Sequence, residues 1–198
     1  MKKSILEKFS LKGKVAVISG TTRGLGQSLA EALAEAGASV VALDRSDTPH
    51  MRRFCKAAGT PFERIRVDLV KASKKDLERI AEGIVKKHSR VDILVNNAGI
   101  SRRGEVWEFT EKDWRDVLKV NLTVPFCLSR AFAKTFMQQG SGKIINIASM
   151  LSFQGGIRVP AYASSKHGIV GLTKSFAIGL GPYGVNVNAI APGFMATD

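Results

Sequence analysis

The chain has 198 residues, 44% of them apolar and 24% charged, a composition typical of one globular domain with a buried core. Its formal net charge of +13 suggests nucleic-acid binding, but the basic residues are scattered over many predicted elements, without a nucleic-acid-binding motif. No apolar run reaches the roughly 20 residues that a bilayer span requires, and no secretory signal is evident. We therefore expect neither a nucleic-acid partner nor a membrane partner. With only two cysteines, Cys55 and Cys127, the sequence favours a cytoplasmic location.

Short apolar runs alternate with segments of helical periodicity along the whole chain. The predicted helices include 27–36 and 75–88, and the predicted strands are 15–19, 39–43, 64–68, 93–95, 143–148 and 186–189. The strands are apolar without alternation, which indicates that helices cover both faces of a parallel sheet. The sequence therefore predicts a single α/β domain over residues 1–198, with a doubly wound parallel sheet of the Rossmann type.

A cluster of glycines follows the first predicted strand and directly precedes a helix. It reads Gly20-Thr21-Thr22-Arg23-Gly24-Leu25-Gly26. Glycine allows a tight turn and a close approach of the backbone to a pyrophosphate, and the N–H groups that begin a helix attract negative charge. The order G-x-x-x-G-x-G is a variant of the dinucleotide fingerprint, so we expect this turn to bind a nucleotide cofactor.

Asp44, at the end of the second predicted strand, bears on which nicotinamide cofactor is used. A carboxylate there can accept hydrogen bonds from the adenosine ribose and repel a 2′-phosphate. Arg23 and Arg45 could instead accommodate that phosphate. We expect NAD as the cofactor, with NADP as the less favoured alternative, and no metal.

Tyr162 and Lys166 are four residues apart at the start of a predicted helix, which places both side chains on one helix face. A tyrosine phenol normally ionises near pH 10, and a neighbouring ammonium stabilises its anion. The pair is a candidate general acid and base for an alcohol or carbonyl oxygen. The fifth predicted strand leads to Ser149, whose hydroxyl can bind the same oxygen. Asn121 lies in a predicted helix, where asparagine forms helix poorly, so we expect it to have a structural or relay role.

In this order and spacing, these segments resemble the short-chain dehydrogenase/reductase family over the whole chain. Further matching segments are Asp68 at the end of the third predicted strand, Asn96-Asn97-Ala98-Gly99 and Pro192-Gly193. The resemblance implies that Tyr162 moves the proton while hydride passes between nicotinamide and substrate. It also implies that Lys166 assists Tyr162 and holds the nicotinamide ribose, that Ser149 orients the substrate oxygen, and that Asn121 supports a proton relay through water. The cofactor contacts expected from it are Gly20, Thr22, Arg23, Gly24, Leu25, Gly26, Asp44, Asp68, Leu69, Asn96, Ala98, Gly99, Tyr162, Lys166, Pro192, Gly193 and Thr197.

The segment 148–160 resembles the subfamily of bacterial 2-dehydro-3-deoxy-D-gluconate 5-dehydrogenases, and the pair Arg102-Arg103 fits the same subfamily. A sugar acid carries a carboxylate that a guanidinium can bind through two hydrogen bonds. We therefore expect Arg102, Arg103 and Arg158 to be substrate-site residues, together with Ser149 and Tyr162. Gluconate 5-dehydrogenase and 3-oxoacyl-carrier reductase activities remain alternatives, as does a cofactor-binding domain without turnover.

Family members usually extend to about 250 residues, so the resemblance implies that a C-terminal segment with a seventh strand is missing after Asp198. Its absence would leave the sixth strand at an exposed sheet edge. The resemblance further implies a homotetramer for the full-length form.

Overall fold

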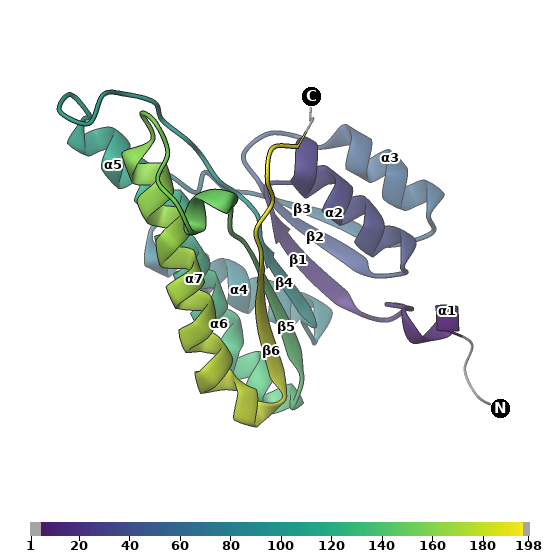
Figure 1. The fold of residues 1–198 in the computed structure, drawn as a ribbon. Helices are drawn as coiled ribbons and strands as arrows, with labels where there is room; N and C mark the ends of the chain where they lie inside the picture. The colour runs from purple at the N-terminus through teal and green to yellow at the C-terminus, as the bar shows by residue number, and fades with distance from the viewer. Residues whose placement is uncertain (1–4, 196–198) are drawn as a thin grey trace.

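A computed structural model describes residues 5–195, and its centre is one sheet of six parallel strands (Figure 1). The spatial order is β3-β2-β1-β4-β5-β6. It reverses between β1 and β4, which makes the fold doubly wound and confirms the predicted fold class. The strands are β1 (Val15–Ser19), β2 (Ser39–Asp44), β3 (Phe62–Arg66), β4 (Ile93–Asn96), β5 (Gly142–Ile147) and β6 (Val185–Ile190).

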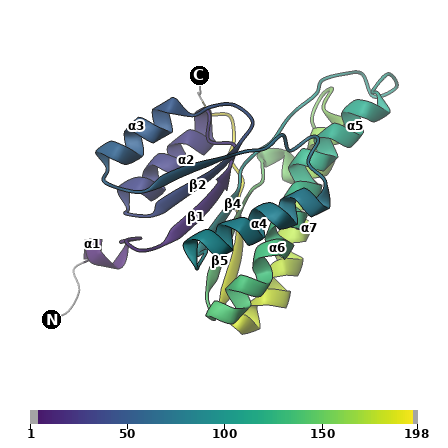
Figure 2. The ribbon, with the colours of Figure 1, turned by 180° about the vertical axis from the view of Figure 1, so that it is seen from behind.

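Helices cover the two faces of the sheet in separate groups. Helices α2 and α3 lie over β1, β2 and β3 on one face, and α4, α6 and α7 lie on the other, as Figure 2 shows from behind. The helices are α1 (Ile5–Lys8), α2 (Gly24–Glu35), α3 (Pro49–Ala57), α4 (Lys74–His88), α5 (Glu111–Leu118), α6 (Val124–Gln139) and α7 (Pro160–Leu180). Three short helices complete the described chain: a π-helical segment η1 (Lys119–Thr123) and the 3-10 turns η2 (Met150–Ser152) and η3 (Gly181–Tyr183).

Each central strand sends alternate side chains into two different cores. Val17 of β1 belongs to the core beneath α4 and α6, which includes Leu94 and Phe132. Its neighbour Ile18 belongs to the core beneath α2 and α3, with Met51. Every residue of β1 is buried, which explains why the strand is apolar without alternation.

The predicted strand boundaries differ from the observed ones by at most two residues, and the difference at β3 changes the place of a candidate site residue. Strand β3 ends at Arg66, so Asp68 lies beyond the strand and not at its end. The pairing of β2 with β3 stops at Asp44 and Arg66, and the Asp68 carboxylate instead accepts a hydrogen bond from the Val70 backbone in a turn. Strand β5 ends at Ile147, one residue before the predicted end.

The carboxyl ends of the strands form the edge where ligands bind in such sheets. Strand β6 lies at one side of the sheet, paired only with β5 in the described structure, as the sequence predicts. No helix within the described residues is long and apolar enough to cross a membrane.

Replacing either of two glycines by alanine should change the stability of the fold in opposite directions. An added Cβ at Gly83, in the exposed middle of α4, meets nothing within 4 Å, whereas one at Gly142 collides with the Phe136 ring. We expect Gly83→Ala to raise the free energy of unfolding by about 0.5–1 kcal/mol, because alanine favours the helix. We expect Gly142→Ala to lower it by about 1–3 kcal/mol through overpacking. Urea denaturation measures both, and a change of the same sign in the two variants would contradict the packing described.

Candidate active site

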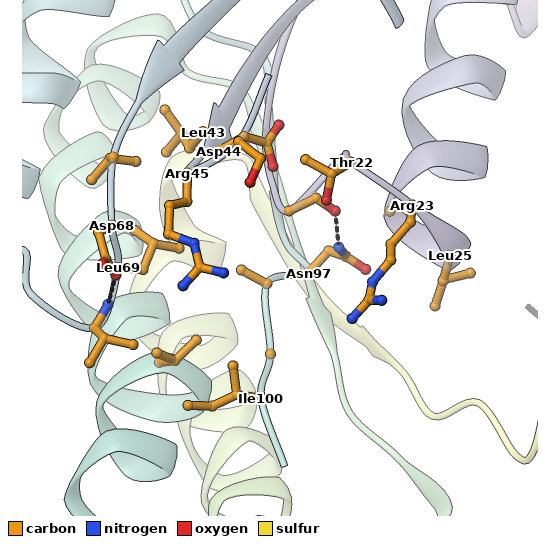
Figure 3. Close-up of a pocket in the computed structure, with 18 residues that line it drawn as sticks. Thr22, Arg23, Leu25, Leu43, Asp44, Arg45, Asp68, Leu69, Asn97 and Ile100 are labelled. Atoms are coloured by element: carbon orange, nitrogen blue, oxygen red, sulfur yellow. Dashed lines mark hydrogen bonds between the residues drawn. The ribbon is translucent and has the colours of Figure 1, made fainter. Parts of the chain in front are cut away.

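A cavity of about 330 Å³ opens at the carboxyl ends of β1, β2 and β4, where the strand order reverses (Figure 3). Glycine-rich backbone forms one side, and the turns after β2, β3 and β4 form the others. The lining consists of Gly20, Thr22, Arg23, Leu25, Gly26, Leu43, Asp44, Arg45, Ser46, Val67, Asp68, Leu69, Val70, Asn97, Ala98, Gly99, Ile100 and Val120. It includes most of the residues expected to contact a cofactor.

The glycine turn requires glycine at two positions, because a side chain would be unfavourable at either. Gly20 has a φ of +78°, a conformation that favours glycine. At Gly26 a Cβ would overlap the Gly20 carbonyl oxygen and the Asn97 side chain. The Asn97 amide fills that space, because its Nδ2 donates to the carbonyls of Ser19 (3.0 Å) and Gly20 (2.8 Å). Helix α2 then begins at Gly24 with no side-chain cap, so its first N–H groups are available to an anion.

Asp44 lies in the lining, but its carboxylate is already engaged. Its two oxygens accept hydrogen bonds from the Thr21 backbone N–H (2.8 Å) and the Thr21 hydroxyl (2.6 Å). Burial raises the pKa of Asp44, and the Thr21 bonds oppose this rise. Asp44 therefore first holds the glycine turn against β2, a role that sequence reasoning did not assign. Arg23 and Arg45 also line the cavity (Figure 3).

The end of β4 corrects one expected contact. Asn96 is 4% exposed and does not line the cavity. Its amide instead donates to Ser129 Oγ (3.1 Å) and Asn146 Oδ1 (2.8 Å) inside the protein. The next residue, Asn97, faces the cavity and was missed. Because successive residues of an extended chain point to opposite sides, the placement of Asn96 in the core leaves Asn97 at the glycine turn.

Tyr162 and Lys166 occupy the first turns of α7, as predicted. The Lys166 side chain is almost fully buried, and its Nζ donates to the Ile147 carbonyl at the end of β5 (2.5 Å). Nζ also lies 5.5 Å from the centre of the Tyr162 ring. Burial lowers the pKa of Lys166 from its ordinary 10.5 to about 8. The ammonium is thus held beside the tyrosine with only one hydrogen bond within the described structure.

Asn121 lies in the π-helical segment η1, not in a regular helix. Its Oδ1 accepts from the Ile100 N–H (2.8 Å), and its Nδ2 donates to the Ile100 carbonyl (2.9 Å) and Ser165 Oγ (3.1 Å). Ser165 in turn donates to the Tyr162 carbonyl (2.7 Å). The Asn121 side chain therefore ties the cavity-lining Ile100 to the start of α7. Both amide hydrogens are used in these bonds, so this side chain has none left to donate to a relay water.

Ser149 is buried two residues beyond the end of β5 and caps the turn η2. Its Oγ accepts from the Leu151 N–H (3.1 Å), which leaves its own hydroxyl hydrogen available for a substrate oxygen. The segment after β6 lies beside this turn, because Met150 N donates to the Pro192 carbonyl (3.0 Å). Pro192 and Gly193 do not line the cavity, and Thr197 lies outside the described residues.

Two of the three arginines expected to bind substrate are paired with carboxylates of this chain. Arg102 contacts Asp113 (3.3 Å), and Arg158 contacts Glu105 (3.0 Å). Arg158 also has a φ of +63°, and its carbonyl accepts from the Gly104 N–H (3.0 Å), so it joins two loops. Arg103 is exposed and makes no ion pair within the described part of the chain. Of the three, Arg103 has the guanidinium that is free for a ligand.

Comparisons with known proteins identify the family of this chain. The family model for short chain dehydrogenases matches residues 14–198. The 2-dehydro-3-deoxy-D-gluconate 5-dehydrogenase of Escherichia coli K12 is 47% identical over 195 residues, which cover 98% of this chain and 76% of that protein. A gluconate 5-dehydrogenase from Burkholderia cenocepacia, solved with NADP and tartrate, is 34% identical with a TM-score of 0.89. The match covers 96% of this chain and 75% of the Burkholderia chain. An NAD+-bound xylitol dehydrogenase is 30% identical with a TM-score of 0.88, and the match covers 94% of this chain and 72% of the xylitol dehydrogenase chain.

The buried ammonium of Lys166 predicts a pH-dependent stability. Its pKa of about 8 in the native state is lower than that of a lysine in the unfolded chain. Between about pH 8 and 10, Lys166 is therefore protonated in the unfolded chain and largely neutral in the native one. Burial of the ammonium disfavours the native state fully below about pH 8, and this cost is lost as the pH rises. Over that interval the free energy of unfolding of the wild-type chain should rise relative to that of Lys166→Met. Denaturant titrations at several pH values measure the difference.

Lys174→Met is the matched control, because Lys174 is an exposed lysine of the same helix. Its difference from the wild type should stay flat over the same interval. A flat difference for Lys166→Met as well would contradict a desolvated Lys166.

Proposed function

This chain belongs to the short-chain dehydrogenase/reductase family, and we propose that it oxidises and reduces a sugar acid with a nicotinamide cofactor. One observation carries the proposal. The buried Lys166 lies over the Tyr162 ring and donates to the carboxyl end of β5, close to Ser149 in the sequence. The hydrogen bonds of Asn121 connect this group to Ile100 in the wall of the cavity. These bonds support the proposal that the proton-transfer groups act on a substrate beside a nucleotide held in the cavity.

The residues of the cavity fit a dinucleotide. Gly20 and Gly26 leave the turn without side chains, and the uncapped start of α2 attracts the pyrophosphate. Asp44, Asp68 and Leu69 also line the cavity, and we assign them to the adenosine end. Lys166 has two further N–H donors for the nicotinamide ribose. When bound, the nicotinamide supplies the acceptor or donor for the hydride.

In the oxidation direction, the proton and the hydride leave the substrate by different routes. The hydroxyl proton passes to Tyr162 Oη as the C–H electron pair departs with the hydride and the C=O bond forms. Tyr162 enters this step as the phenolate, and the Lys166 ammonium stabilises its negative charge until the proton arrives. Ser149 donates its hydroxyl hydrogen to the same substrate oxygen. Asn121 keeps Ile100 and α7 in place, and a water bound to the free lone pair of its Oδ1 would continue the proton path.

We propose 2-dehydro-3-deoxy-D-gluconate as the substrate, because the Escherichia coli relative carries that name at 47% identity. We also propose a homotetramer in the cytoplasm. Exposed apolar side chains on α6 and α7, Phe126 and Ile178, support assembly, and the buried, unpaired Cys55 and Cys127 support a reducing location. Sedimentation velocity measures the mass of the assembly.

Replacing Tyr162 tests the proposed reaction directly. We expect Tyr162→Phe to lower kcat by at least about 100-fold, because the acid–base group is lost, and to retain cofactor binding. Nicotinamide absorbance follows turnover with 2-dehydro-3-deoxy-D-gluconate, gluconate and a 3-oxoacyl thioester, and nucleotide fluorescence follows binding. Tight cofactor binding without turnover of any of these compounds by the wild type would favour a binding domain instead.

Asp44 is the residue that we propose favours NAD over NADP. Its carboxylate lies in the cavity wall and repels a 2′-phosphate, while Arg23 and Arg45 allow some use of NADP. We expect Asp44→Ser to raise the ratio of NADP to NAD kcat/KM by at least about tenfold. Asp47→Ser, at an exposed acidic residue outside the cavity lining, should leave the ratio unchanged. If Asp44→Ser also leaves it unchanged, Asp44 serves only the turn.

Arg103 is the arginine that we propose binds the substrate carboxylate. We expect Arg103→Ala to raise the KM for the sugar acid by about 10- to 100-fold, the loss of one or two charged hydrogen bonds, with unchanged cofactor affinity. Arg115→Ala serves as the control, since Arg115 is an exposed arginine of α5 that pairs with Glu111. Equal KM values for both variants would exclude Arg103 from the substrate site.

A further inference from the structure

Four buried polar side chains meet between the sheet and helices α6 and α7. Asn96, Ser129, Asn146 and Thr173 are between 1% and 8% exposed and come from β4, α6, β5 and α7 in that order. Asn96 Nδ2 donates to Ser129 Oγ and Asn146 Oδ1, and Asn146 Nδ2 donates to Thr173 Oγ1 (2.9 Å). They are enclosed on the side of the sheet that carries the larger apolar core.

Such a network restricts how its elements can pack. A buried polar group without a partner destabilises the fold, and these side chains reach their partners only when the helices are correctly placed. Asn96 and Asn146 are already fixed to each other as paired residues of neighbouring strands. Thr173 is therefore the member through which α7 is positioned against the sheet.

Helix α7 contacts two consecutive residues of β5 through polar bonds. Lys166 donates to the Ile147 carbonyl, and Thr173 accepts from the Asn146 side chain. Lys166 and Thr173 are seven residues apart, which is two helical turns, so they lie on the same face of α7. The buried Ile169 lies between them on that face. The two bonds together fix the rotation of α7 and its position along β5.

We propose that the Asn146–Thr173 hydrogen bond is a positioning device for Lys166, and through it for Tyr162. The proposal rests on the proposed function. The Lys166 bond alone would not prevent α7 from rotating, because a lysine side chain is long and flexible. After such a rotation its ammonium would leave the Ile147 carbonyl. The short Thr173 side chain cannot follow in this way, so its bond to Asn146 holds the helix in the arrangement that catalysis requires.

The hydroxyl of Thr173 can be removed with little change in shape. Thr173→Val keeps the branched side chain and leaves Asn146 Nδ2 without its partner, whereas Thr173→Ser keeps the hydroxyl. Thr173 Oγ1 also donates to the Ile169 carbonyl, but that bond lies within α7 and does not position the helix. Ile169→Val is the matched control, because it removes buried apolar volume from the same face of α7 and leaves the network intact.

The test compares kcat, the substrate KM, cofactor affinity and stability in these variants. We expect Thr173→Val to lower kcat about tenfold with a smaller change in KM, since a small misplacement of catalytic groups slows the reaction itself. Cofactor affinity, read from nucleotide fluorescence without turnover, should fall several-fold because Lys166 contacts the ribose. Thr173→Ser should restore kcat to within about twofold of the wild type, and Ile169→Val should lose stability but not kcat.

Two outcomes would overturn the inference. One is a Thr173→Val enzyme whose kcat and cofactor affinity both equal those of the wild type. The other is an equal loss of kcat in Thr173→Val and Ile169→Val, which would mean that general loosening of α7 is responsible. Thr173→Ala carries the same expectation if Thr173→Val does not fold. A wild-type chain without turnover would instead count against the proposed function, and the binding measurement would still test the positioning role.

Discussion

The buried ammonium of Lys166 is the constraint on which the rest of the site depends. A charge in this position is unfavourable unless it is hydrogen-bonded, and the described structure gives it the Ile147 carbonyl. Together with the Asn146–Thr173 bond that we propose positions the helix, this bond holds the first turns of α7 at the carboxyl end of β5. Tyr162 shares those turns, and Ser149 follows the same strand. The arrangement of the proposed proton-transfer groups thus follows from one helix packed on one strand.

The doubly wound topology explains why the nucleotide cavity lies next to this group. The strand order reverses between β1 and β4, so the turns that follow these strands diverge and leave a cavity between them. The glycine turn closes one side, with Asn97 holding it to the segment after β4. That segment continues to Ile100, which Asn121 ties to Ser165 on α7. The backbone of 97–100 and the hydrogen bonds at its two ends therefore connect the proposed phosphate-binding turn to the proposed catalytic helix.

Much of the fold and part of the site could be predicted from the sequence because they depend on local patterns. The uninterrupted apolar strands, the helical periodicity and the glycine turn can each be recognised within a short stretch of sequence, whichever distant residues they pack against. The orientation of Asp44 could not be predicted, because it depends on Thr21, which lies 23 residues earlier. The placement of Asn97 depends in the same way on a distant glycine turn.

The substrate arginines and the buried network illustrate the same limit. Arg158 has a carboxylate partner on another loop, Glu105, and nothing in the local sequence marks that pair. Asn146 and Thr173 are 27 residues apart and resemble ordinary polar residues in an apolar strand and helix. Their significance appears only when α7 is packed on β5, because a hydrogen bond in a core depends on tertiary geometry and not on residue type.

The most direct test of the central claim is the titration of the Lys166 ammonium itself. Nitrogen NMR of a chain with ¹⁵N-labelled lysine side chains reports each ammonium, and the signal absent from Lys166→Met identifies Lys166. Because burial lowers the pKa of Lys166 to about 8, we expect this signal to titrate well below the ordinary range of a lysine. Titration at about pH 10.4, the ordinary value for a lysine side chain in water, would show that Lys166 is hydrated and not held against β5, and would contradict the account.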